Sequence, residues 1–286
     1  MATASGQAIP SAGSSLKWIR GTLIFLAILV VARFILEVAG VSHDITRYVS
    51  SSVAILLAGI YLGAVAPLRG VTKFVRLILP AIVVSAWTVG WVILFTVISA
   101  VFQLNRSHFA DAEDFGNWGH LGQHLLGHVI EFVALSIIVL LLMAVPFLLR
   151  GWPIVVGPVA MLGAVVIIRF WVEAMGLEPL RFAAWSSTIA VLFCGFYLGG
   201  VGPKIGLDSL LGPALIIGWA WRFWVYLATI FAACVPFFKT HFFDPTGGRI
   251  IARLAQNLAG AVVEGLVAGL IVWGIAVWIR SATRPQ

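Results

Sequence analysis

The chain has 286 residues, of which 61% are hydrophobic and 10% are charged, so it is too apolar to cover itself with a soluble surface. A formal net charge of +7 would suggest nucleic acid as the partner of a soluble protein. In a membrane protein the same charge has to be counted by side of the membrane. The composition therefore predicts an integral membrane protein in contact with a lipid bilayer, without a nucleic-acid partner.

Eight apolar stretches of about the length that crosses a bilayer as a helix follow one another along the chain. They lie at 18–39, 48–66, 75–102, 122–149, 152–175, 183–201, 209–237 and 255–279. The runs are continuous and do not alternate with polar residues, which excludes a transmembrane barrel. We predict an all-α fold, a polytopic bundle of eight transmembrane helices.

Basic residues are more frequent on one side of these predicted spans. If the N-terminus lies inside, the inner segments carry Lys17, Arg20, Arg69, Lys73, Arg76, Arg150, Lys204, Arg280 and Arg284, whereas most acidic residues lie in outer segments. The positive-inside rule then predicts cytoplasmic termini in a plasma membrane, or inner membrane of a bacterium. Residues 1–16 are rich in Ala, Ser and Gly and are expected to form a flexible cytoplasmic tail, and 283–286 a short C-terminal tail.

The two halves of the chain resemble each other. A shift of 136 residues places Arg33, Phe34, Glu37 and Gly40 on Arg169, Phe170, Glu173 and Gly176, and a shift of 133 aligns 121–131 with 254–264. We predict two tandem four-helix repeats, 17–150 and 151–282. Because each repeat crosses the membrane an even number of times, the repeats are expected to be parallel, related by a pseudo-two-fold axis along the membrane normal.

Charged residues that recur in both halves are the first candidates for a site. Arg33 and Glu37 are four residues apart and share a helix face, and we place Glu131 at a similar depth near the outer side. An isolated charge there costs about 2.5 kcal/mol or more, so we expect these groups to pair inside the bundle. The predicted substrate or proton site comprises Arg33, Glu37, Gln123, Glu131, Arg169, Glu173, Gln256 and Glu264.

Each predicted repeat has one arginine and two glutamates at this site, so one carboxylate has no arginine to pair with. Such a carboxylate has to be protonated, hydrogen-bonded or matched by a ligand. A functional interpretation gives it a proton or a solute, and a purely structural interpretation gives it a hydrogen bond to a neighbouring helix.

The histidines form a second candidate group. His120, His124 and His128 recur every fourth residue, a spacing at which imidazoles can bind a metal ion or a haem. The second half has Arg253, Asn257 and Ala261 at the matching positions, so the cluster belongs to one half only. Proton handling, polar packing at the outer mouth and a solvated helix start remain alternatives.

A histidine and an aspartate recur in the longest outer loops. His108 and Asp111 match His241 and Asp244. They are interpreted either as a cap over the outer site or as residues that hydrogen-bond to the start of a helix.

The chain has no phosphate-binding loop, no GxSxG elbow and no HExxH motif, which disfavours an enzyme without excluding one. We predict transport of a small solute or ion through the buried arginine and glutamate layer. A metal- or haem-binding subunit of a membrane redox complex and a non-catalytic membrane scaffold are the alternatives. Other membrane subunits or a second copy of the chain are possible partners.

Overall fold

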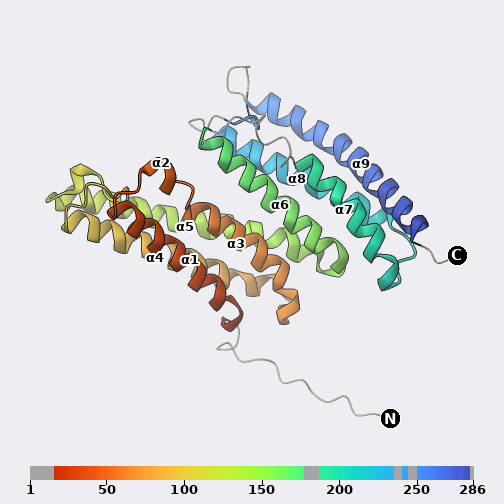
Figure 1. Cartoon of the computed structure of the whole chain (residues 1–286), viewed down its shortest axis with the longest axis horizontal. Coiled ribbons are helices and arrows are strands. Elements are labelled where there is room, and N and C mark those ends of the chain that lie inside the picture. The colour runs from red at the N-terminus through yellow and green to blue at the C-terminus, as the bar shows by residue number, and fades with distance from the viewer. Residues whose placement is uncertain (1–15, 177–186, 235–239, 244–249, 284–286) are drawn as a thin grey trace, which may run out of the picture. The chain divides into compact units, whose positions relative to one another are not determined.

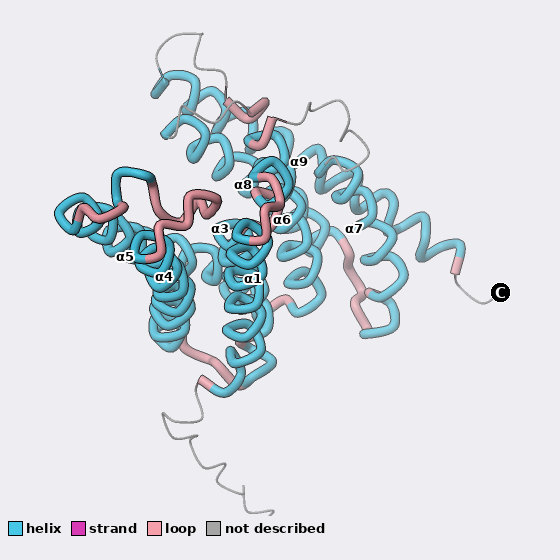
Figure 2. The backbone as a smooth tube through the Cα atoms, turned by 60° about the vertical axis from the view of Figure 1, so that its left-hand side comes forward, coloured by secondary structure: helices cyan, strands magenta, loops and turns pink. Residues whose placement is uncertain are grey.

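The computed structural model describes residues 16–176, 187–234, 240–243 and 250–283. These residues are helices and loops, and apart from an isolated bridge between Thr240 and Phe243 no β-structure is assigned among them (Figure 2). The predicted all-α fold is confirmed for the described part of the chain. Two compact units divide the chain, Met1–Leu141 and Leu142–Gln286, and α5 (Trp118–Leu148) continues across the boundary between them.

Seven helical segments are long and apolar enough to cross a membrane. They are Lys17–Val38, His43–Val65, Phe74–Val101, Trp118–Gly151, Pro153–Ala174, Leu211–Cys234 and Ile250–Ala282. The helix at the sixth predicted span, 183–201, is α7 (Ser187–Val201), which is apolar and has 15 residues. Residues 177–186 lie outside the described residues. The chain is therefore a multi-pass membrane protein by helix length and hydropathy.

In the first unit, α1 (Arg20–Val38) packs against α4 (Ile78–Val101) and α3 (Ser51–Val65), as Figure 1 shows. The Trp87 indole N–H donates a hydrogen bond of 2.8 Å to the carbonyl oxygen of Leu23, which joins α4 to α1. Such a bond satisfies the indole without water, as packing within lipid requires.

In the second unit, α8 (Leu211–Cys234) lies beside α9 (Ile250–Ala282) and also contacts α6 (Pro153–Ala174), while α7 packs against α9 (Figure 1). Small residues permit this close approach. A Cβ on Gly218 of α8 would lie 2.3 Å from the carbonyl oxygen of Gly265 and 2.4 Å from the backbone nitrogen of Gly269. Membrane helices commonly associate through such glycine contacts, since lipid supplies no hydrophobic drive between them.

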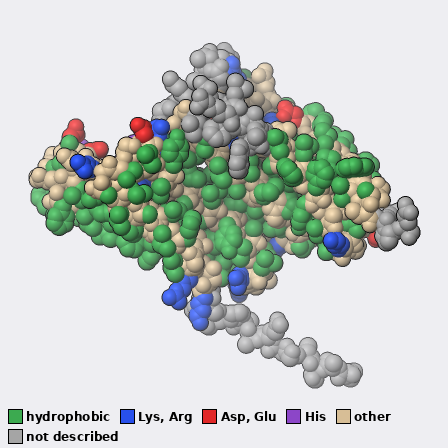
Figure 3. Space-filling model, in the orientation of Figure 1, with side chains coloured by type: hydrophobic (Ala, Val, Ile, Leu, Met, Phe, Trp, Pro, Cys, Tyr) green, Lys and Arg blue, Asp and Glu red, His purple; other side chains and the backbone are tan. Residues whose placement is uncertain are grey.

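The outward side chains of both units are apolar. Ile28, Val133 and Val263 are each exposed by half or more, and Figure 3 shows hydrophobic side chains over most of the visible surface. In water such a surface would aggregate, whereas in a bilayer it contacts acyl chains. Contact with lipid follows for both units.

Glycines with left-handed backbone end the helices that carry the buried glutamates. Gly40, after α1, has φ +90°, and Gly176, after α6, has φ +86°. The N–H of each glycine donates to the backbone carbonyl of the glutamate three residues earlier, Glu37 or Glu173. Only glycine adopts this conformation without strain, which accounts for its presence at both positions.

Gly218→Ala is expected to push α8 and α9 apart, because its Cβ would overlap backbone atoms that cannot move independently. We expect the free energy of unfolding to fall by about 1–3 kcal/mol or more. Unfolding in mixed detergent micelles measures the change. Gly274→Ala on α9 is the control, because nothing lies within 4 Å of the added Cβ. Equal stability of the two variants would contradict the close packing of α8 on α9.

Candidate functional site

A buried carboxylate stands at the C-terminal end of α1. The Glu37 side chain is 1% exposed, and its Oε1 accepts hydrogen bonds from Arg33 Nε at 3.1 Å and from the Thr46 hydroxyl at 3.0 Å. Its Oε2 accepts the backbone N–H of His108 at 3.0 Å and lies 2.5 Å from His108 Nδ1. Both oxygens are therefore satisfied by protein groups, as burial within lipid demands.

The second unit repeats this arrangement at the end of α6. Glu173, also 1% exposed at its side chain, accepts Arg169 Nε at 3.0 Å through Oε1. Its Oε2 accepts the backbone N–H of His241 at 3.0 Å and forms a short contact with His241 Nδ1. The predicted pairs Arg33–Glu37 and Arg169–Glu173 are thus both present, and in each unit the second partner of the carboxylate is a loop histidine.

Aromatic packing holds each loop histidine in place. The His108 ring lies 4.2 Å from the Phe109 ring, and Phe109 packs on Phe34 of α1 with ring centroids 5.9 Å apart. In the second unit His241 lies 4.1 Å from Phe242, which packs on Phe170 of α6 at 5.7 Å. In each unit the phenylalanine that follows the arginine on the helix therefore packs against a phenylalanine of the loop. The histidine that precedes the loop phenylalanine contacts the buried carboxylate.

Each of these imidazoles keeps one nitrogen free of the carboxylate. The glutamate beside an arginine is ionised and can only accept a hydrogen bond, so the proton on Nδ1 has to belong to the histidine. In the neutral tautomer Nε2 then carries a lone pair. The side chains are about a third exposed, 32% for His108 and 39% for His241, so a proton can reach them.

Burial lowers the pKa of His108, and the hydrogen bond to Glu37 opposes this effect without cancelling it. The Arg33 charge adds to the lowering. The neutral imidazole is therefore the favoured form of His108 near neutral pH.

The second glutamates of the predicted site have other partners. Glu131 lies 3.0 Å from His128 on the same helix, and Glu264 lies 2.9 Å from Arg222 of α8. Their side chains are 43% and 54% exposed, and each surplus carboxylate is thus paired. The other two members of the predicted site, Gln123 and Gln256, are exposed on α5 and α9.

The three histidines of α5, His120, His124 and His128, do not all contact the same carboxylate. Asp114, buried in the loop before α5, accepts His120 Nδ1 and His124 Nδ1 at 2.7 Å each. Burial alone would raise the pKa of Asp114, but hydrogen bonds from His124, His120 and the Asp111 N–H hold that pKa below its usual value. His128 turns away, with Nδ1 near Glu131 and Nε2 3.4 Å from the Thr96 hydroxyl.

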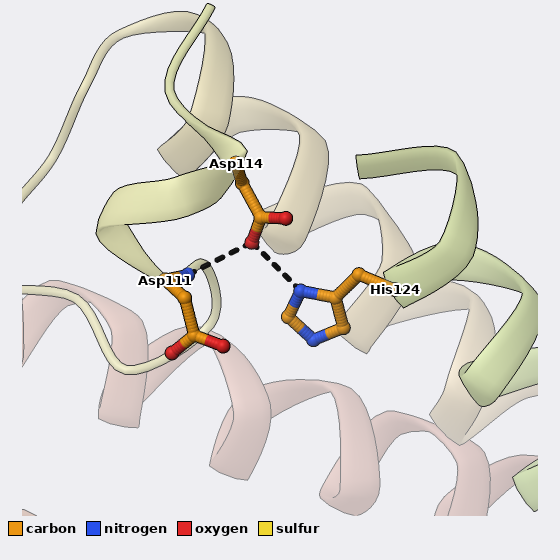
Figure 4. A group of neighbouring side chains, drawn as sticks. All are labelled: Asp111, Asp114 and His124. Carbon is orange, nitrogen blue, oxygen red and sulfur yellow. Dashed lines mark hydrogen bonds and ion pairs between the residues drawn. The ribbon is translucent and has the colours of Figure 1, made fainter. Parts of the chain in front are cut away.

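A metal ion would find a different ligand set from the three histidines. Ligand atoms of Asp111, Asp114 and His124 lie within 4.8 Å of one another, and Figure 4 shows the Asp114 carboxylate between His124 and the Asp111 backbone. His120 is occupied on both sides, because its Nε2 lies 3.1 Å from Glu113. Two carboxylates and one imidazole form a donor set that suits a divalent cation.

The loop aspartate has a local role. The Asp111 side chain accepts the backbone N–H of Asp114, and the Asp114 side chain accepts the Asp111 N–H at 2.8 Å, which is a capping box on the 3-10 helix Ala112–Asp114. The matching residue Asp244 lies outside the described residues. Asp111 thus agrees with the interpretation as a residue that hydrogen-bonds to the start of a helix. His108 instead contacts Glu37 of the predicted site.

Sequence reasoning missed Arg222. It stands in the apolar run of α8 and lines a cavity of about 220 Å³ with Thr229, His241 and Asn257. The signal was available, because a single arginine inside an apolar span indicates function or a buried partner. It was overlooked because the matching residue in the first half is Val89. A larger cavity of about 580 Å³, between α1 and α3, contains none of the predicted site residues.

Comparison with protein-family models, with curated proteins and with solved structures finds no match to this chain.

His108→Gln tests the lowered pKa of His108. The unfolded chain binds the proton at the ordinary histidine pKa of about 6.5, more readily than the folded chain. The stabilisation due to neutral His108 is therefore present above that pH and falls as the pH drops through it. Thermal unfolding in detergent at pH 7.5 and 5.5 should show a smaller difference between wild type and variant at the lower pH. A difference that grows at pH 5.5 would mean that His108 is held as the cation.

Proposed function

We propose that this chain is a membrane transport protein that moves a small solute or ion together with a proton. The observation that carries the proposal is the carboxylate–imidazole pair, Glu37 with His108 and Glu173 with His241, which has the same contacts in both units. Buried carboxylate and histidine groups within membrane proteins commonly mark ion pathways and proton relays.

The geometry suits a group that takes up and releases a proton. Each carboxylate is fully buried, while its imidazole is partly exposed and keeps Nε2 away from the carboxylate. Histidine changes charge near neutral pH, so a proton can enter at Nε2 while the Nδ1–H of the histidine keeps its hydrogen bond to the glutamate. Arg33 and Arg169 balance the carboxylate charge in either state.

We further propose that the two halves are tandem parallel repeats with both termini in the cytoplasm of a plasma membrane. Two observations support this arrangement. Lys17, at the start of the first span, and Arg69, just after α3, line one cavity and so lie at the same end of the first unit. The acidic residues Asp44 and Asp111 lie at the other ends of helices, beyond α1 and α4, which agrees with the positive-inside rule.

The proposal predicts proton movement coupled to a solute. Proteoliposomes that contain a pH-sensitive dye, with the membrane potential clamped by potassium and valinomycin, receive an inward gradient of sodium chloride, sodium sulfate or sodium phosphate. We expect at least one salt to change the internal pH through the protein. Glu37→Gln and Glu173→Gln should slow that change by about tenfold or more, because the imidazole loses the charge that stabilises its protonated form.

Asp44→Asn is the matched control, since it removes an exposed carboxylate that pairs with Arg47 on the surface. It should leave the rate unchanged. If no salt moves protons and the glutamine variants only lower the unfolding midpoint, the charged groups hold the helices together and the chain is a scaffold.

A divalent metal site is a second candidate function, favoured by Asp111, Asp114 and His124 in the first unit. Haem is less well supported, since both ring nitrogens of His120 and of His128 already have partners: Asp114 and Glu113 for His120, and Glu131 and Thr96 for His128.

Metal analysis of purified protein tests this second function. Protein dialysed against zinc or manganese should retain about one equivalent of metal per chain if these residues bind it. Asp111→Asn should lower the retained amount, while Asp208→Asn, in the second unit, should not. Protein without retained metal and without visible absorbance would exclude both the metal and the haem readings.

A further inference from the structure

The cavity of about 220 Å³ in the second unit is lined by groups suited to an anion. Its lining comprises Arg222, Val225, Tyr226, Thr229, His241, Phe242 and Asn257. Arg222 adds a permanent positive charge, and the side chains of Tyr226, Thr229, His241 and Asn257 can also donate hydrogen bonds. Ligand cavities for drug-sized molecules span about 300–1,000 Å³, so this one suits a small solute.

Arg222 is only partly matched by protein groups. One terminal nitrogen lies 2.9 Å from Glu264 of α9, and the guanidinium lies over the Trp221 ring at 5.2 Å. Its Nε is buried and, among the described residues, has no hydrogen-bond partner. A buried donor without a partner is rare in folded proteins, and a bound acceptor is a common explanation.

Glu264 does not remove the need for an anion. Its 2.9 Å contact uses one terminal nitrogen of Arg222 and leaves the buried Nε without a hydrogen-bond partner among the described residues. The Arg222 side chain is itself only 19% exposed. A solute oxygen that reaches Arg222 from the cavity would therefore gain a charge-assisted hydrogen bond of the kind guanidinium groups form with carboxylate and phosphate.

His241 connects the cavity to the buried Glu173. Nδ1 of His241 contacts the carboxylate, and the same residue lines the cavity. The charged and titratable groups around the cavity and His241 come from three helices: Arg169 and Glu173 on α6, Arg222 and Tyr226 on α8, and Glu264 on α9. An anion in the cavity would favour the protonated imidazole, which would couple its binding to proton uptake.

The first unit lacks the equivalent cation. The sequence match places Val89, Ile93 and His124 where the second unit has Arg222, Tyr226 and Asn257. Val89 is buried and apolar. The two units share the carboxylate–imidazole pair and the arginine one turn before the carboxylate, but the position of Arg222 is apolar in the first unit.

From these observations we infer that the cavity between α8, α9 and the His241 loop binds a small oxyanion, a carboxylate or a phosphate- or sulfate-like group, through Arg222, Tyr226 and Asn257. This inference rests on the proposed function, because it names the class of solute that the transport would move. The binding itself is a property of the cavity and can be measured without transport.

The test is binding to the full-length protein in detergent or nanodiscs. Sodium sulfate, inorganic phosphate and sodium malonate are titrated, with sodium chloride at equal ionic strength as the reference, and the thermal unfolding midpoint and calorimetric heats are recorded. At least one oxyanion should raise the midpoint beyond the chloride reference. Arg222→Gln should weaken its binding by about tenfold or more, since a charge-assisted hydrogen bond is lost.

Arg47→Gln is the matched control, because it removes an arginine of the first unit that pairs with Asp44 on the surface. It should bind as wild type does. If Arg222→Gln does not fold, Tyr226→Phe and Asn257→Ala take its place, and each should weaken binding by a few-fold. Binding unaffected by these two substitutions, or no binding of any oxyanion, would overturn the inference.

The result separates this inference from the proposed function. Binding that depends on Arg222 without any coupled proton movement in proteoliposomes would keep the site and reject transport. Proton movement that proceeds unchanged in Arg222→Gln, together with no oxyanion binding that depends on Arg222, would keep transport and reject the site.

Discussion

A carboxylate buried within a bilayer has to find all its hydrogen-bond partners inside the protein, and this constraint organises each unit. Glu37 and Glu173 meet it with an arginine one helical turn earlier and with the backbone and side chain of a loop histidine. The loop is therefore attached to the helix end by charge-assisted bonds, with Phe109 or Phe242 packed beneath it. The long loop becomes part of the bundle, because leaving the carboxylate unmatched would destabilise the fold.

The two units meet the same constraint and then diverge in the groups around it. In the first unit the additional polar residues are His120 and His124, which share Asp114. In the second unit they are Arg222 and Glu264, at the edge of a small cavity. One unit thus offers acidic and imidazole groups suited to a cation, and the other offers a guanidinium suited to an anion.

The candidate site was partly predictable. Arg33 and Glu37, four residues apart on one helix, could be paired from sequence, because helical geometry places them on one face. The partner His108 could not, since it lies 71 positions away and arrives only when the loop folds back. The recurrence of the histidine in both halves was the available signal, but it did not say which group the imidazole contacts. Arg222, the partner of Glu264, is likewise distant in the chain, whereas Glu131 pairs with His128 three residues earlier on the same helix.

The amino-acid sequence by itself determined that the chain lies in lipid, and it determined the helices and most of the membrane spans. Continuous apolar runs of that length satisfy their backbone hydrogen bonds in lipid by forming helices. It also determined the local pairs one turn apart and the glycines at the ends of α1 and α6. Only the tertiary structure decided the rest: that Asp114 collects two histidines, that Gly218 meets Gly265, and that Arg222 borders a cavity with His241. These contacts join residues far apart in the chain, and their distances depend on how whole helices pack, which no local pattern records.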